Sequence, residues 1–399
     1  MFPKLSDLIN YLIGSNINLP VQTYGFFLAL AFTSGGIILR WELKRKEKEG
    51  LLQARRVSTQ PNSPASWPEF LGGLLFSTLI GWKFFGIMID YPVFAANPQQ
   101  YMLSAKGSLV ALIIIPVITS CYHIFTFYRI RKYDISAEKD VLVHPWQQTW
   151  NIMFVAIVSA LAGSKIFDIF DNFSQFLNHP VRSFFSFSGF AFYGGFITTV
   201  VVLMLYMKML RLNWKHVIDC SAPAIMLGYA IGRLGCHLSG DGCWGIVNTI
   251  TQPHLLAWLP DWMWAYNFPH NVANQGVHIA GCIGPHCRQL AQPVFPTSLY
   301  ESLISFGSFG LIWLVRIRTK APVVLFGIFM VLNGIERFFI EKIRVNPKYS
   351  VLGMKLSQAE IISALLIMIG VAVIIYFQKS YRAGFVEKEP TVSPPQTGQ

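Results

Sequence analysis

Long apolar stretches alternate with short polar segments along almost the whole chain. About 20 predominantly apolar residues are enough for an α-helix to cross the hydrocarbon core of a bilayer. The pattern predicts nine such helices, at about 22–40, 67–89, 107–127, 148–170, 187–210, 217–235, 296–315, 322–343 and 357–377. We therefore expect the all-α fold class, as a polytopic helical membrane protein with about nine transmembrane helices.

Composition and charge exclude other classes of protein. Hydrophobic residues make up 53% of the 399 residues and charged residues only 13%, whereas soluble domains average about 25% charged residues. The net charge of +12 does not indicate a nucleic-acid-binding protein, because the basic residues are spread between the apolar stretches and form no single basic patch. A soluble multidomain enzyme and a nucleic-acid-binding protein are both disfavoured.

The positions of the basic residues predict an orientation in the membrane. Lysines and arginines concentrate in the segments after the first, third, fifth, seventh and ninth predicted helices, as in 40–56 and 316–320. Cytoplasmic loops carry such an excess of basic residues. We therefore expect the N-terminus outside and the C-terminus in the cytoplasm.

The chain is expected to form one transmembrane domain over residues 1–383. It includes a polar inner linker at 44–66 and a small outer (periplasmic) head at 236–295, which is rich in tryptophan and cysteine. Residues 384–399 are rich in Pro, Thr and Ser and are expected to be a disordered cytoplasmic tail.

Part of the chain resembles another part. An offset of 82 residues aligns the hairpin at about 67–127 with the hairpin at about 148–210, and matches Gly81 with Gly163 and Lys83 with Lys165. This similarity predicts a duplicated helical hairpin.

Ionisable side chains inside predicted spans are costly and therefore mark candidate functional sites. Arg233 lies near the outer end of the sixth span. One face of the eighth span carries a polar row at helical spacing, formed by Asn333, Arg337, Glu341 and Arg344. Two arginines that meet in the outer leaflet suit a phosphate group.

Internal ion pairing is the alternative interpretation of these charges. Arg337 has Glu341 one turn away and Glu301 in the seventh span, and Arg344 can extend to the membrane interface. Asp219, at the inner start of the sixth span, is interpreted as a cap of that helix end.

The predicted head contains the four cysteines Cys236, Cys243, Cys282 and Cys287. In an oxidising compartment we expect two disulfides, although the sequence does not choose among the three possible pairings. Zinc binding with nearby histidines is an alternative, but the spacing matches no standard zinc signature. A redox-active pair is the third possibility.

The segment around Arg233 carries a motif. Residues 232–245 read Gly-Arg-Leu-Gly-Cys-His-Leu-Ser-Gly-Asp-Gly-Cys-Trp-Gly. This run resembles the signature Gly-Arg-x-Gly-Asn-Phe-x-Asn-x-Glu of bacterial prolipoprotein diacylglyceryl transferases. Four more segments resemble that family's motifs in the same order: Tyr24-Gly25, Asp219 with Pro223, Pro296-Thr297-Ser298-Leu299-Tyr300-Glu301, and Arg337-Phe338-Phe339-Ile340-Glu341 with Arg344.

The resemblance implies an activity and its partners. A diacylglyceryl group passes from phosphatidylglycerol to the lipobox cysteine of a prelipoprotein signal peptide, and glycerol phosphate leaves. The reaction takes place on the outer side of the bacterial inner (cytoplasmic) membrane, among the inner-membrane lipids, and implies no cofactor, no metal and no nucleic acid.

The resemblance also implies roles for individual residues. Arg233 and Arg337 match the family's two essential arginines and are expected to stabilise the charge that grows on the phosphate. His237 or Glu341 is expected to assist in removing the thiol proton, while Tyr193 hydrogen-bonds the lipid or the thiol. The residues expected to bind substrate are Tyr24, Gly194, Gly195, Asp241, Tyr300, Glu301, Asn333 and Arg344.

The chain departs from the family pattern at several motif positions. Tyr193 stands in place of a histidine, Cys236 and Ser239 in place of asparagines, Asp241 in place of a glutamate and Asn333 in place of a tyrosine. Two alternatives therefore stay open. The first is a lipid-binding or transport protein that keeps the fold without transferase activity. The second is a thiol oxidoreductase built on the outer cysteines.

Overall fold

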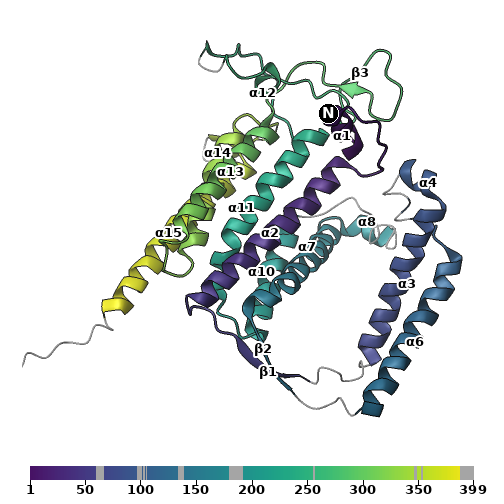
Figure 1. Cartoon of the computed structure of the whole chain (residues 1–399). Helices are drawn as coiled ribbons and strands as arrows, with labels where there is room; N and C mark the ends of the chain where they lie inside the picture. Colours follow the sequence, from purple (N-terminus) through teal and green to yellow (C-terminus); the bar gives the residue numbers. More distant parts are fainter. Residues whose placement is uncertain are drawn as a thin grey trace, which may run out of the picture. The chain divides into compact units, whose positions relative to one another are not determined.

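The computed structural model describes residues 1–59, 67–96, 101, 104, 106–133, 139–178, 192–254, 257–345, 348–351 and 354–386. Long α-helices dominate this part of the chain (Figure 1). They are α2 (Thr23–Lys48), α3 (Trp67–Ile89), α6 (Leu109–Tyr133), α7 (Thr149–Asp171), α10 (Phe192–Met209), α11 (Trp214–Ser239), α13 (Thr297–Val315), α14 (Val324–Glu341) and α15 (Gln358–Val386). Each apolar stretch picked out in the sequence overlaps one of these helices, so the predicted all-α fold class is confirmed.

Among the described residues, seven of the long helices are both long and apolar enough to cross a membrane. The apolar part of α10 is shorter, at Gly194–Met209. The 18 residues of α14 include the charged side chains of Glu336, Arg337 and Glu341. The polytopic membrane class is confirmed, and the two helices outside the set of seven are the shortest of the long helices.

The remaining elements are short. The helices are α1 (Leu5–Ile13), α4 (Tyr91–Ala96), the 3₁₀ turn η1 (Pro145–Gln148), α8 (Phe173–Asn178) and α12 (Asp261–Trp264). Three antiparallel strand pairs join β1 (Arg55–Thr59) with β2 (Lys139–Val143), β3 (Val277–His278) with β4 (Arg288–Gln289), and β5 (Lys348–Val351) with β6 (Met354–Ser357). Of the tail expected at 384–399, the first three residues continue α15, and residues 387–399 lie outside the described part of the chain.

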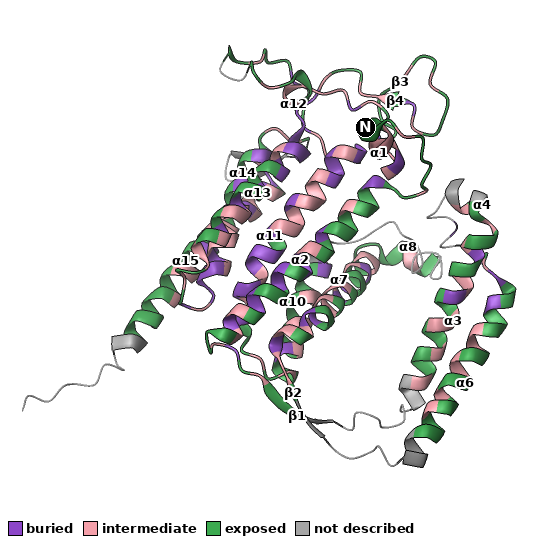
Figure 2. Ribbon diagram, viewed as in Figure 1, coloured by how far each residue is buried: buried purple, intermediate pink, exposed green. Residues whose placement is uncertain are grey.

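The chain folds as two compact units. The first contains α2, α7, α8, α10, α11, α13, α14 and α15 with the head, and the second contains α1, α3, α4 and α6. In the second unit few residues of α3 and α6 are buried, as expected for helices that face lipid (Figure 2). Buried positions concentrate on α11 of the first unit.

Each unit contains one of the two similar hairpins, α3–α6 in one and α7–α10 in the other. In the first hairpin the hydroxyl oxygens of Ser77 and Thr119 lie 3.1 Å apart. In the second, the Ser159 hydroxyl donates to Thr199 Oγ1 at 3.4 Å. Matched serines thus link the two helices in both hairpins, while the duplication itself stays a prediction.

Helix α11 lies between α2 and α13 in the first unit (Figure 1). A Cβ atom on Gly35 would lie 3.2 Å from the Ala224 carbonyl oxygen, so α2 and α11 approach closely where small residues face each other. On the other side, the Ser302 hydroxyl donates to the Ala230 carbonyl at 2.9 Å. Because α11 runs antiparallel to both neighbours, its C-terminal end meets their N-terminal ends.

Asp219 is fully buried on α11, but it does not cap that helix. Its carboxylate accepts hydrogen bonds from the backbone N–H groups of Val323 (2.9 Å) and Phe326 (3.0 Å), at the start of α14. The sequence interpretation was wrong about which helix is capped. The reason is that the N–H groups of the α14 N-terminus need acceptors, and a neighbouring helix supplies them.

We expect Asp219→Ala to lower the free energy of unfolding by about 1–2 kcal/mol, because the first turn of α14 loses its acceptors. Thermal unfolding of the detergent-solubilised protein measures the change. Asp261→Ala, at an exposed position in the head, is the matched control and should leave the melting temperature unchanged. Equal melting temperatures for the two variants would contradict the capping role.

Candidate functional site

Three arginines from two parts of the chain converge on one buried carboxylate. Glu301, in the second turn of α13, is fully buried. Its Oε2 atom lies 2.9 Å from Arg233 Nε of α11, and its Oε1 atom accepts hydrogen bonds from Arg337 and Arg344, each at 3.1 Å. The charges identified in the sequence therefore form a single cluster, which we call the arginine cluster.

The cluster holds a second buried carboxylate, that of Glu341. It lies 3.1 Å from the other terminal nitrogen of Arg337, one helical turn away. Arg344 is positioned by its backbone, which pairs with Gly245 in an antiparallel bridge. The Arg344 side chain thus points to Glu301, and both ion pairs expected for Arg337 are formed.

The arginine cluster keeps the capacity to bind an anion. In these ion pairs three guanidinium groups share the two carboxylates of Glu301 and Glu341. The ion pair between Arg233 and Glu301 uses only Nε, so in the described residues the terminal nitrogens of Arg233 still offer N–H donors. The side chains of Arg233 and Arg337 are 20% and 26% exposed, so a ligand can reach them.

Glu336 is a buried acid of α14 that the sequence interpretation missed. It is 3% exposed, and both of its carboxylate oxygens accept from the Ser305 hydroxyl of α13, at 3.0 and 2.9 Å. The signal was available, because a carboxylate inside a predicted span is as unusual as an arginine there. This hydrogen bond holds α14 against α13. On α13 it lies one helical turn after Glu301 of the arginine cluster.

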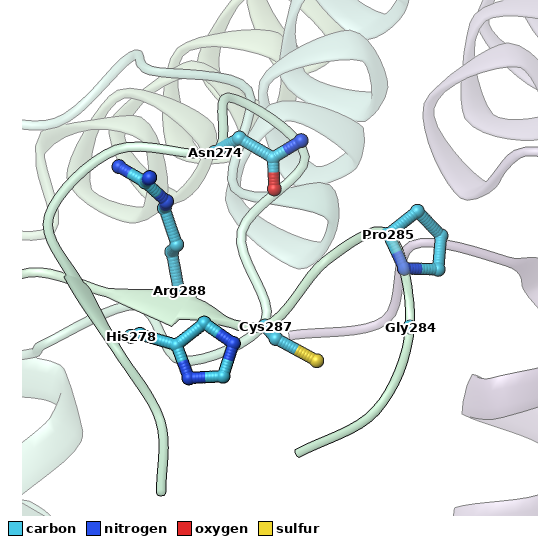
Figure 3. Close-up of a pocket in the computed structure, with 6 residues that line it drawn as sticks. All are labelled: Asn274, His278, Gly284, Pro285, Cys287 and Arg288. Atoms are coloured by element: carbon cyan, nitrogen blue, oxygen red, sulfur yellow. The ribbon is translucent and has the colours of Figure 1, made fainter.

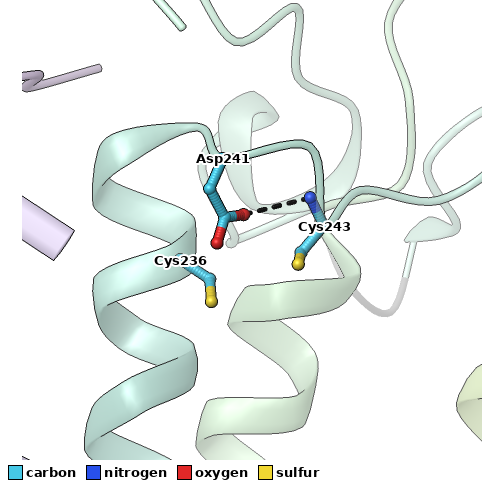
Figure 4. Close-up of side chains that lie close together, drawn as sticks. All are labelled: Cys236, Asp241 and Cys243. Atoms are coloured by element: carbon cyan, nitrogen blue, oxygen red, sulfur yellow. Dashed lines mark hydrogen bonds between the residues drawn. The ribbon is translucent and has the colours of Figure 1, made fainter. Parts of the chain in front are cut away.

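The two cysteine pairs of the head differ. Cys282 and Cys287 form a disulfide with a Cα–Cα distance of 5.5 Å. Cys236 and Cys243 are free thiols, so the prediction of a second disulfide is wrong. Their sulfur atoms lie together with a carboxylate oxygen of Asp241 instead (Figure 4).

His237, one of the two predicted bases, lies in an aromatic enclosure at the end of α11. It is 3% exposed, and ring centroids of Trp262, Tyr266 and Phe268 lie 5.6–6.2 Å from its own. The aromatic contacts of His237 are thus with the head, whereas Glu341 belongs to the arginine cluster. Whether either removes a proton stays a prediction.

The predicted substrate-binding glycines are packing positions. Gly194 and Gly195 are buried in α10, where a Cβ atom would come within 2.3 Å of Phe167 and 2.2 Å of the Ser164 hydroxyl of α7. They permit close contact between α7 and α10. The side chain of the adjacent Tyr193 lies outside the described residues.

Three more predicted residues lie on the helices next to the cluster residues in sequence or in space. Tyr24 is the second residue of α2, and its ring lies 3.8 Å from where a Cβ atom of Gly235 would be. The Tyr300 hydroxyl donates to the Met263 carbonyl of the head at 2.7 Å, and half-buried Asn333 lies one turn before Arg337. The residues around α11 are thus brought together, whereas Gly194 and Gly195 belong to a separate helix contact.

An open recess of about 450 Å³ lies elsewhere in the head (Figure 3). It is lined by Asn274, His278, Gly284, Pro285, Cys287 and Arg288. None of the arginine-cluster residues lines it. The recess is therefore not the candidate site.

Comparison with known proteins identifies the family. The family model described as prolipoprotein diacylglyceryl transferase matches residues 112–376, which is more than half of the chain. The chain belongs to the prolipoprotein diacylglyceryl transferase family. The matched range includes α11, α13 and α14, and hence every residue of the arginine cluster.

Individual relatives carry the name phosphatidylglycerol–prolipoprotein diacylglyceryl transferase. One from Leptospira interrogans is 31% identical over 229 residues, which are 51% of this chain and 64% of that relative. One from Chromobacterium violaceum is 26% identical over 262 residues (63% and 87%), and one from Ralstonia pickettii is 27% identical over 248 residues (60% and 79%). The chain thus spans slightly less than two thirds of the length of the Leptospira relative.

Proposed function

We propose that this protein transfers a diacylglyceryl group from phosphatidylglycerol to the cysteine of a prelipoprotein signal peptide, forming a thioether and releasing glycerol phosphate. The observation that carries the proposal is the convergence of Arg233, Arg337 and Arg344 on Glu301, in a chain of this family. The names of the relatives give the donor and the acceptor.

The arginine cluster suits the departure of a phosphate. As the bond between glycerol carbon and phosphate oxygen breaks, negative charge grows on the phosphate. Fixed guanidinium groups stabilise that charge most strongly in a site with little water, and they need no rearrangement as the reaction proceeds. The Glu301 carboxylate fixes them before substrate arrives, since each of the three arginines is ion-paired with it.

In this proposal the protein lies in the bacterial inner membrane, with the N-terminus outside and the C-terminus in the cytoplasm. The basic segments 44–48 and 316–320 support the orientation, because they lie at the far ends of α2 and α13 from Tyr24 and Glu301. The arginine cluster then lies at the outer side of the membrane. Both membrane-embedded substrates reach it there.

The direct test supplies purified protein with phosphatidylglycerol and a lipobox peptide. We expect the peptide to gain one diacylglyceryl group by mass spectrometry, with release of glycerol phosphate. A peptide with serine in place of the cysteine should stay unmodified. Binding of phosphatidylglycerol without any modified peptide would contradict the proposal and favour a lipid-binding or transport protein.

A further inference from the structure

The turn after α11 gathers three side chains of the types that bind transition metals. Cys236 lies in the last turn of α11, and Asp241 and Cys243 follow it. Their two sulfur atoms and one carboxylate oxygen all lie within 4.8 Å of one another (Figure 4). Two sulfur ligands of a tetrahedral zinc ion lie about 3.8 Å apart, given Zn–S bonds of about 2.3 Å. The three groups are therefore within a small side-chain movement of zinc geometry.

The backbone of the turn is built to bring these groups together. Gly240 and Gly242, on either side of Asp241, have φ angles of +67° and +100°, a region that favours glycine. The Asp241 carboxylate accepts a hydrogen bond from the Cys243 N–H at 3.1 Å. The Asp241 carboxylate is thus held against the backbone of Cys243 by a contact within the turn.

The group of three adjoins the arginine cluster. Arg233 precedes Cys236 by three residues and shares its helix face. The Thr297 hydroxyl, at the start of α13, donates to the Cys243 carbonyl at 3.0 Å, and Glu301 follows one turn later on that helix. Two thiolates and one carboxylate around a divalent cation carry one net negative charge, and the Arg233 guanidinium group lies on the same helix face as one of these thiolates.

We propose that Cys236, Asp241 and Cys243 bind a zinc ion whose fourth position takes up the thiol of the acceptor cysteine. A catalytic zinc has three protein ligands and one open position, and a coordinating thiol is deprotonated. This inference rests on the proposed function and deepens it. It replaces proton removal by His237 or Glu341 with coordination of the thiol beside the phosphate-binding arginines.

As the acceptor cysteine binds, the proton of its thiol would pass to solvent water. The sulfur of that cysteine then forms the bond to the glycerol carbon, and the bond from that carbon to the phosphate oxygen breaks. The electron pair of the broken bond leaves with glycerol phosphate, next to Arg233 and Arg337.

Cobalt(II) is the probe for the metal site, because it replaces zinc and absorbs light when thiolates bind it. We expect the reduced, metal-free full chain in detergent to bind one equivalent, with the strong near-ultraviolet absorption of cobalt–thiolate bonds, and zinc to displace it. A lipobox peptide should change this spectrum, whereas the peptide with serine in place of cysteine should not. Absence of the cobalt–thiolate absorption would overturn the proposal.

Variants locate the site. Cys236→Ser and Cys243→Ser should each remove most of the thiolate absorption and weaken cobalt binding by at least about tenfold. Cys121→Ser, which removes an exposed free cysteine of α6, is the matched control and should bind like the parent chain. Because Cys236 is buried, zinc-dependent melting of the unaltered chain gives a second measurement that needs no variant. Cobalt binding unchanged in both site variants would overturn the assignment.

The same samples separate this inference from the proposed function. Peptide lipidation by protein that is free of zinc, or in which Cys236 and Cys243 form a disulfide, would overturn the zinc site and leave the transferase intact. Cobalt binding with the thiol-dependent spectral change, but no lipidation under any condition, would instead overturn the transferase and support only a thiol-binding metal site.

Discussion

Replacing Arg233 by alanine is expected to lower the rate of diacylglyceryl transfer by about 100- to 1,000-fold, and Arg337→Ala by a similar factor. The physical reason is that both guanidinium groups are held on the buried Glu301 carboxylate before substrate binds. The charge on the departing phosphate then loses a donor that no other group replaces. The rate of appearance of the lipidated peptide, with phosphatidylglycerol in excess, is the measurement.

Two further variants make the result specific. Arg233→Lys keeps the charge but loses the planar fork of donors, so we expect a rate between those of the parent chain and Arg233→Ala. Arg318→Ala removes an exposed arginine just beyond the far end of α13 and should leave the rate unchanged. If folded Arg233→Ala and Arg337→Ala proteins lipidate as fast as the Arg318→Ala protein, the arginines do not bind the phosphate.

The sequence was sufficient for the helices and for the meeting of Arg233 and Arg337. The length of each apolar stretch predicts a helix. Because successive helices cross the membrane in alternating directions, the C-terminal ends of α11 and α14 lie on the same side. Helical spacing also predicted the ion pair between Arg337 and Glu341, which is local to one helix. These features depend on periodicity and on residues that lie close in the chain.

Contacts between segments that lie far apart in the chain could not be predicted from the sequence in the same way. Asp219 serves a helix that begins about a hundred residues later, and its sequence neighbours carry no sign of that partner. Glu301 was one of two predicted partners for Arg337, but its role as the shared acceptor of three arginines depends on how α11, α13 and α14 pack. That Cys236 and Cys243 are free thiols could likewise not be predicted, since cysteine spacing alone allows three pairings.

Glu301→Gln is expected to abolish detectable transfer and to lower the free energy of unfolding by about 3–5 kcal/mol, the usual cost of removing one partner from a buried ion pair. The glutamine side chain has nearly the same size, but its NH₂ group would point donors at guanidinium groups that are donors themselves. Arg233, Arg337 and Arg344 would then repel one another without the shared acceptor. Thermal unfolding and the lipidation assay measure the two effects separately.

Glu42→Gln is the control that separates the catalytic effect of Glu301 from its effect on stability. Glu42 is also buried, at 1% exposure, and also joins two arginines, with Arg45 at 2.7 Å and Arg316 at 2.8 Å. It lies near the opposite end of α2 from Tyr24. We expect Glu42→Gln to lower the melting temperature as Glu301→Gln does while the folded protein keeps its transfer rate. Normal transfer by both variants below their melting temperatures would mean that Glu301 holds helices together but does not prepare the arginines for phosphate. Only the role in preparing the arginines depends on the position of Glu301 at the outer end of the bundle.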